Sequence, residues 1–168
     1  MTSTPMEMQP LDGASTISIL ERNSVGRLAF VRGNRLTIVP INYVYANGWL
    51  YGRTSKGEKI QRVGSTAYDW WPVVFEVDEV DYVDGTRTVC GWRSAVVHGG
   101  IEVLDRTKGT KRDDAIRIMQ GADPAAFTAA DPFPDRDIVF RISALDATGR
   151  AATPQAGVKR ELAGAGAT

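Results

Sequence analysis

The sequence is poor in the residues that build disulfide bonds and metal centres. Among its 168 residues it has one cysteine, Cys90, and one histidine, His98. A single cysteine cannot form an internal disulfide bond, which fits a reducing compartment. One cysteine and one histidine also cannot fill the coordination shell of a metal unless carboxylates supply most of the ligands. We therefore expect neither a disulfide framework nor a metal site.

Long apolar runs and an excess of charge of one sign are missing as well. No apolar stretch approaches the roughly 20 residues that a membrane-spanning helix needs. Residues 1–10 are polar and lack the cationic start and apolar block of a signal peptide, so we expect a cytoplasmic protein with no membrane partner. The 20 basic and 20 acidic residues cancel. Because sequence-independent nucleic-acid binders normally carry a basic excess, we expect no nucleic-acid partner.

What is present suits one small domain. The hydrophobic fraction of 43% is enough for a core, and 17 glycines with 4 tryptophans favour β structure. The length fits one domain, or one domain with a tail. We expect a disordered N-terminus over residues 1–10, a folded domain over 11–150, and a disordered tail over 151–168, where few apolar anchors remain.

Alternation of apolar and polar residues indicates six strands, most of them joined by hairpin turns. Helical spacing indicates short helices over residues 13–23 and 107–121, and residues 56–64 have the pattern of a third. A small sheet of this kind curls to protect its edges. The sequence therefore predicts a mainly β fold, a six-stranded antiparallel barrel with two or three short peripheral helices. The predicted strands cover residues 25–31, 35–45, 48–54, 73–78, 91–104 and 137–143.

The stretch from Gly48 to Lys59 concentrates the chemistry of the chain. Arg53, Thr54 and Ser55 place a guanidinium and two hydroxyls on consecutive residues where a strand is expected to end. Lys59 follows where a helix is expected to begin. Two cations, two hydroxyls and free N–H groups at a helix start suit a phosphate dianion. The alternative is a solvated basic turn, since Arg and Lys are mostly surface residues.

The strand expected over residues 35–45 contains Pro40 and Asn42. A proline within a strand removes one ladder donor and indicates an edge, a bulge or an interrupted pairing. Backbone groups that leave the ladder need another partner, and a flat heterocycle with donors and acceptors can supply it. An ordinary edge strand with a polar face is the alternative. The Asn47–Gly48 turn is expected to bring residues 40–43 alongside 52–55, so that one ligand touches both.

Five segments of the chain follow one another in a recognisable order: Ser24–Ala29, Val39–Tyr43, Leu50–Thr54 with Lys59, Val74–Asp78, and Gly91–Trp92 with Ser94–Val97. This series resembles the pyridoxamine 5′-phosphate oxidase-like family of flavin-binding split barrels, and within it the branch of small oxidase-related proteins. The similarity covers about residues 14–105, and more loosely Ile138–Arg150.

The resemblance implies FMN bound at the interface of a homodimer, and it assigns roles to individual positions. Arg53, Thr54 and Lys59 would hold the phosphate, with Ser55 as an addition. Trp92 and Ser94 would close the flavin site, from the other subunit. The strand residues that would line the isoalloxazine ring, mostly through backbone groups, are Pro40, Ile41, Asn42 and Tyr43.

The resemblance also implies an FMN-dependent oxidoreductase acting on a small, unidentified substrate. No catalytic residue is assigned, because the flavin itself carries the redox chemistry. The end of this chain runs into Ala and Gly and lacks the Arg and His that true pyridoxamine phosphate oxidases use, so that activity is not expected. The alternatives are a non-enzymatic flavin carrier or sensor, a deazaflavin-dependent reductase, and a haem-handling protein for which His98 would be the imidazole.

Overall fold

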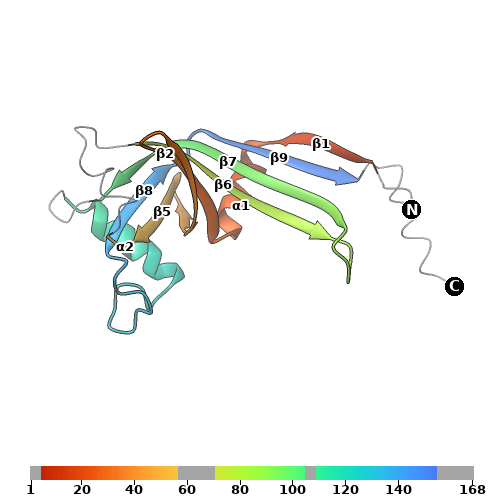
Figure 1. The fold of residues 1–168 in the computed structure, drawn as a ribbon. Coiled ribbons are helices and arrows are strands. Elements are labelled where there is room, and N and C mark those ends of the chain that lie inside the picture. Colours follow the sequence, from red (N-terminus) through yellow and green to blue (C-terminus); the bar gives the residue numbers. More distant parts are fainter. Residues whose placement is uncertain (1–4, 57–70, 105–108, 155–168) are drawn as a thin grey trace.

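The computed structural model describes residues 5–56, 71–104 and 109–154. In this part of the chain, nine strands form one antiparallel sheet, and two helices pack against it (Figure 1). The helices are α1 (Gly13–Arg22) and α2 (Lys111–Ala122). The strands are β1 (Met6–Leu11), β2 (Val25–Arg32), β3 (Arg35–Asn42), β4 (Val44–Ala46), β5 (Trp49–Thr54), β6 (Trp71–Tyr82), β7 (Val89–Val103), β8 (Ile138–Ser143) and β9 (Ala147–Pro154).

The sheet curls into a barrel that remains open along one seam. Its strand order is β3-β2-β6-β7-β8-β5-β4, so β3 and β4 lie at opposite ends of the order. These two strands are nevertheless consecutive in the chain and are joined at Tyr43. The two ends of the sheet therefore meet at this residue without a continuous ladder between them. This is a split barrel, and the predicted mainly β, antiparallel class is confirmed.

Four strands continue beyond the barrel as an arm, which Figure 1 shows extending to the right. The arm consists of the distal parts of β6 and β7 together with β9 and β1. Strand β7 links the two regions, because Trp92–Val97 pairs with β9 whereas Ile101–Val103 pairs with β8. One long strand thus belongs to both the barrel and the arm.

The prediction of a disordered N-terminus is wrong for residues 6–10. These residues belong to β1, which pairs along its whole length with β9, from Met6 opposite Pro154 to Leu11 opposite Gly149. Strand β9 supplies the ladder partners, so a polar segment can form an edge strand without burying many side chains. Strand β9 also continues to Pro154, past the expected domain end at residue 150. Residues 155–168 of the expected tail, and residues 57–64 of the third expected helix, lie outside the described residues.

Helix α1 lies where the sequence predicts a helix, within the expected range of residues 13–23. The carboxylate of Asp12 accepts a hydrogen bond from the N–H of Ser15 at 2.7 Å, which satisfies one of the unpaired donors of the first turn. The buried residues Thr16, Ile19 and Leu20 share one face of the helix. That face packs into the main core, whose largest fully buried side chains are Phe75 and Phe140. The helix thereby covers one face of the sheet close to the open seam.

Candidate functional site

The seam of the barrel is built around Tyr43. Its side chain is buried, its hydroxyl donates to the carbonyl oxygen of Leu20 at 2.9 Å, and its ring meets Phe75 edge-on with centroids 4.9 Å apart. Burial raises the pKa of this phenol above its usual range, so it stays protonated and keeps donating. The backbone N–H of Tyr43 donates to the carbonyl oxygen of Ser24 at 2.9 Å. Tyr43 therefore turns inward and interrupts the strand that was predicted to run from 35 to 45.

Strand β3 is an edge strand, which is one of the three arrangements that the proline indicated. Among the described residues it pairs only with β2, and Pro40 lies opposite Arg27 in that ladder. Leu36, Ile38, Pro40 and Asn42 form its exposed face, and Leu36 is 88% exposed. The backbone groups on the outer side of β3 are therefore available to a partner from outside this part of the chain.

The predicted pairing of residues 40–43 with 52–55 is corrected by the observed ladders. Residues 35–42 pair with β2, and only Val44–Ala46 pairs with β5, with Val44 opposite Tyr51. The reason is the inward turn at buried Tyr43, which ends β3 before β4 begins. The two segments still meet across the seam, because Asn42, Tyr43 and Arg53 line one pocket.

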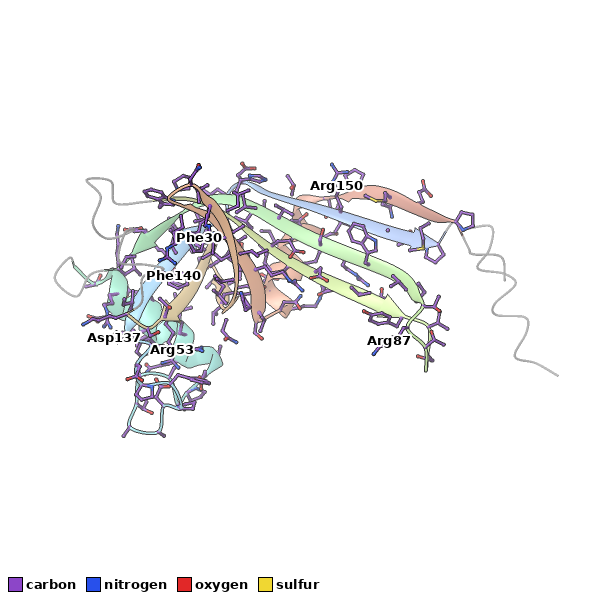
Figure 2. The ribbon with its side chains drawn as sticks, in the orientation of Figure 1. Phe30, Arg53, Arg87, Asp137, Phe140 and Arg150 are labelled. Carbon is purple, nitrogen blue, oxygen red and sulfur yellow. The ribbon has the colours of Figure 1, made fainter. Side chains whose placement is uncertain are left out.

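This pocket has a volume of about 230 Å³ and lies between the seam and the segment that follows α2. The barrel supplies one wall, the end of α2 a second, and the loop of residues 123–137 a third. Figure 2 shows Arg53 close to α2 and to this loop. The lining residues are Ser24, Asn42, Tyr43, Val44, Tyr51, Gly52, Arg53, Met119, Ala122, Asp123, Ala126, Phe133 and Arg136.

Arg53 forms a buried ion pair with Asp131 in the loop. Its Nη2 donates to Oδ1 of Asp131 at 2.9 Å, and its Nη1 donates to Oδ2. The two side chains are 12% and 3% exposed. The guanidinium also lies 4.8 Å from the centroid of the Phe127 ring, a favourable cation–π contact. Arg53 therefore ties the loop to the barrel.

Asp131 is surrounded by donors. Its carboxylate accepts the backbone N–H groups of Phe127 at 2.7 Å and of Phe133 at 2.8 Å, in addition to the guanidinium. The hydrogen bond from Arg53 is the main reason why the pKa of this carboxyl lies well below its usual range, and the two amides add to the effect. The same hydrogen bond raises the pKa of Arg53. Both groups are therefore charged at neutral pH.

A second guanidinium, that of Arg136, lies at the same pocket. It lies over the ring of Phe133, 4.3 Å from the centroid. Among the described residues, no carboxylate forms an ion pair with it. The two arginines differ in this respect, since Arg53 has a buried carboxylate partner and Arg136 does not.

The remaining predicted site residues lie in three places. Thr54, the last residue of β5, is half-buried opposite Ile138, and Ser55 is exposed beside it. Lys59 lies outside the described residues. Trp92 and Ser94 are on β7 in the arm and do not line the pocket of their own chain.

A second, larger cavity of about 800 Å³ lies elsewhere on the barrel and contains none of the predicted site residues. It is mostly apolar and is bounded by β2, β3, and the facing parts of β6 and β7. Phe30, Leu36 and Pro72 contribute to its apolar wall, and His98 also lines it. In the described part of the chain, no three His, Cys, Asp or Glu side chains are grouped to hold a metal. No helix there is long and apolar enough to cross a membrane.

Sequence reasoning missed the loop residues of the site, which are Asp131, Phe133 and Arg136. The segment over residues 122–136 is rich in Pro, Asp and Ala, and it has no periodicity that would predict a contact. Asp131 lies 78 positions after Arg53. The segment's two phenylalanines within residues 127–136 are a weak signal, and they do not identify a partner.

The fold is that of a split β-barrel with a pocket at its seam. The chain belongs to the pyridoxamine 5′-phosphate oxidase family, whose family model matches residues 12–151. This shows the family that the sequence resemblance indicated. Among curated proteins, no match was found.

Solved structures with the same fold include several described as flavin-binding. An FAD-binding protein from Mesorhizobium loti is 28% identical, with 89% of this chain and 99% of that chain covered and a TM-score of 0.64. An FAD-binding protein from Mycobacterium smegmatis is 22% identical, with 85% and 98% covered and a TM-score of 0.58. An FAD- and haem-binding protein from the same organism is 16% identical, with 96% and 80% covered and a TM-score of 0.61. The last two show likeness of fold alone.

Proposed function

We propose that this chain binds a flavin nucleotide at the seam, with the ring along residues 40–43 and the phosphate near Arg53. The observation that carries the proposal is that Asn42, Tyr43 and Arg53 line one pocket although they come from both sides of the seam. Membership of the family supports it, as does the FAD-binding relative from Mesorhizobium loti.

The donor set suits a phosphate group. A guanidinium carries five N–H donors, and Asp131 uses two of those on Arg53. The ion pair therefore fixes the orientation of Arg53 and still leaves donors that can face a second anion. The hydroxyls of Thr54 and Ser55 and the ammonium of Lys59 complete the proposed shell, and Arg136 adds a further cation at the pocket wall.

The pocket is too small for a whole flavin nucleotide, so we expect only the phosphate end of the ligand to lie inside it. Ligand pockets usually span about 300–1,000 Å³, so a pocket of about 230 Å³ suits the phosphate end and not a whole flavin. The flat ring would then lie outside it, along the edge of β3 next to Pro40, Ile41 and Asn42. An edge strand offers outward N–H and C=O groups, which match the donors and acceptors of a flavin ring.

We further propose a homodimer, in which the arm of one copy completes the site of the other. Val80, Trp92, Ala152 and Met8 lie directly opposite one another in adjacent strands, so they form a row across one face of the arm. We call this the outer face. Met8 is 57% exposed there and Trp92 is half-buried. A second copy is the covering layer that such an apolar row favours.

Helix α1 lies on the opposite face of the arm. Arg22 and Asn23, at its end, donate to the carboxylate of Glu79 at 2.9 and 2.8 Å. Side chains alternate along a strand, so Glu79 and its neighbour Val80 point to opposite faces. Helix α2 packs against β4, β5 and β8. Neither helix therefore covers the outer face in the described part of the chain.

When bound, the flavin would supply hydride or electron transfer. The residues of this chain would bind and orient it, because Arg53, Thr54, Ser55 and Lys59 would hold the phosphate while β3 would hold the ring edge. We propose an oxidoreductase of a small substrate, and we assign no catalytic acid or base. A flavin carrier and a deazaflavin-dependent reductase are the alternatives on the same fold.

FMN is the flavin that the family resemblance implies, and FAD is the second candidate because of the Mesorhizobium loti relative. Both share the phosphate next to the ribityl chain, so the same pocket serves either.

The absorption spectrum of the purified protein tests the proposal. We expect flavin bands, and mass spectrometry of the released cofactor to show FMN; FAD would establish the second candidate. Deazaflavin or haem bands would contradict the proposal, as would a protein that neither contains flavin nor takes it up. Turnover of a reduced nicotinamide with a quinone or nitro compound would then separate an enzyme from a carrier.

A further inference from the structure

The charged groups at the seam pocket are not equivalent. Arg53 is engaged with the buried carboxylate of Asp131. The carboxylate of Asp123 also lines the pocket, and it accepts the backbone N–H of Ala125 at 3.2 Å. Arg136 is the third charged side chain of the lining, and no described carboxylate pairs with it. An anion that enters the pocket therefore meets one guanidinium whose charge is not already balanced by a direct partner.

Four other cations near α2 and the loop have partners among the described residues. Lys111 and Arg141 both pair with Glu102, and Arg117 pairs with Asp114. Arg112 donates to the carbonyl oxygen of Asp137 at 3.1 Å. Arg136 differs from these four residues because its guanidinium has no such partner among the described residues.

The loop holds Arg136 in a defined position. The N–H of Arg136 donates to the carbonyl oxygen of Phe133 at 3.0 Å, which forms a turn, and the guanidinium lies over the ring of that same residue. The contact with the ring restricts the orientation of the guanidinium before any ligand arrives. Asp131, two residues before Phe133, is fixed to Arg53 on the barrel. Such preorganisation reduces the entropic cost of binding.

We propose that Arg136 recognises the anionic end of the ligand of this pocket, and that the Arg53–Asp131 pair acts as the clamp that holds its loop in place. The ligand group is a phosphate monoester, which for the proposed function is the phosphate of the flavin nucleotide, so this inference rests on that proposal for the identity of the ligand. Asp123 opposes the anion and limits the affinity.

The test compares FMN with riboflavin, which lacks the phosphate, by quenching of flavin fluorescence on the full-length protein. The variants are Arg136→Gln, Arg136→Lys and, as a matched control on the exposed side of α2, Arg117→Gln. Arg136→Gln should weaken FMN binding by about 10- to 100-fold, the range of a charge-assisted hydrogen bond, and riboflavin binding by less than about threefold. Arg136→Lys should recover part of the loss, and Arg117→Gln should stay within about twofold of the wild type.

An equal loss for FMN and riboflavin, or no loss for either, would overturn the assignment. The Asp131→Asn variant distinguishes a carboxylate that holds the loop in place from one that competes with the phosphate for Arg53. If the pair is a clamp, this variant binds FMN more weakly because the loop loosens. Tighter binding would mean that Asp131 competes with the phosphate for Arg53, and the clamp would be rejected. Asp123→Asn should tighten FMN binding and leave riboflavin binding unchanged.

Titration with inorganic phosphate, followed by NMR of the arginine Nε–H groups, is independent of the flavin. We expect a saturable shift at Arg136 and not at Arg117. A protein that binds no flavin but shows this shift would refute the proposed function and keep the inference. A protein that binds FMN with no dependence on Arg136 and no phosphate shift would keep the function and refute the inference.

Discussion

The guanidinium of Arg53 binds both carboxylate oxygens of Asp131, a residue 78 positions later in the chain. The pair joins the end of β5 to the loop that closes the seam pocket. It is almost fully buried, and its carboxylate also accepts two backbone amides. A pair satisfied in this way is costly to break from one side only, because the remaining charge stays buried without a partner. Four predictions concern this pair, the pocket wall and the arm.

The first prediction concerns the contribution of the pair to stability. Arg53→Ala and Asp131→Ala should each lower the Tm of the ligand-free protein by roughly 5 to 10 °C. The double variant should lose little more than either single variant, because both remove the same interaction. The exposed pair Arg117–Asp114 is the matched control, and its variants should shift Tm by less than about 2 °C. Additive losses at Arg53 and Asp131 in thermal unfolding would contradict a coupled pair.

The second prediction concerns pH. The pKa of Asp131 is lower in the folded protein than the usual value of about 3.9, because of Arg53. Its stabilising contribution is therefore complete above the unfolded pKa and is lost as pH falls toward the folded pKa. The difference in free energy of unfolding between wild type and Asp131→Asn should be constant from about pH 6 to 8 and should shrink below about pH 4. Urea unfolding at each pH measures it, and a constant difference down to pH 3 would refute the assignment.

The third prediction concerns Gly52, which lines the pocket opposite Phe140 in the β5–β8 ladder. A Cβ at this position would clash with Cζ of the buried Phe140 ring. Gly52→Ala should therefore destabilise the protein by about 1–3 kcal/mol, as overpacking does. Gly121→Ala in α2, where no atom lies within 4 Å, should be neutral or stabilising by up to about 1 kcal/mol. Urea unfolding measures the stability of both variants against the wild type. A Gly52→Ala variant as stable as the wild type would show that the Phe140 ring moves aside without cost.

The fourth prediction concerns the arm. Trp92→Glu places a charge in the middle of the apolar row on the outer face, so it should convert the proposed dimer into monomers and release bound flavin. Ala129→Glu adds the same charge on the exposed 123–137 loop and should leave the dimer intact. Sedimentation equilibrium measures the molar mass of both variants and so distinguishes dimer from monomer. A monomeric wild-type protein, or a Trp92→Glu variant that stays dimeric, would argue against the outer face as the interface.

Local patterns in the sequence predicted much of the fold. The helix over residues 13–23 was predicted from spacing alone, and an edge strand was one of the three arrangements that Pro40 indicated for β3. Strand β1 was not predicted, because its ladder is supplied by β9, more than a hundred positions away. Pairing between distant backbone segments does not require a particular composition, so the polar sequence of β1 could not predict it.

For the candidate site, the sequence predicted one side of the pocket and missed the other. Arg53 was singled out because it lies beside two hydroxyls where a strand was expected to end. Asn42 was singled out because it follows Pro40 in the same strand, and Tyr43 because the family resemblance includes it. The loop wall with Asp131 and Arg136 depends on tertiary packing, since a carboxylate in a loop has no local signature of its partner. The exchange of β3 for β4 at Tyr43 was missed for a similar reason, because a buried tyrosine hydroxyl finds its acceptor only in the folded chain.

Titration of the flavin-free protein with FMN tests the central claim most directly. The wild type should bind one FMN per chain with saturable quenching of flavin fluorescence. The double variant Arg53→Ala with Lys59→Ala should bind at least about 100-fold more weakly, the loss expected for two charge-assisted contacts, while circular dichroism confirms that it remains folded. A wild type that does not bind FMN, or a folded double variant with unchanged affinity, would contradict a phosphate site at this corner of the barrel.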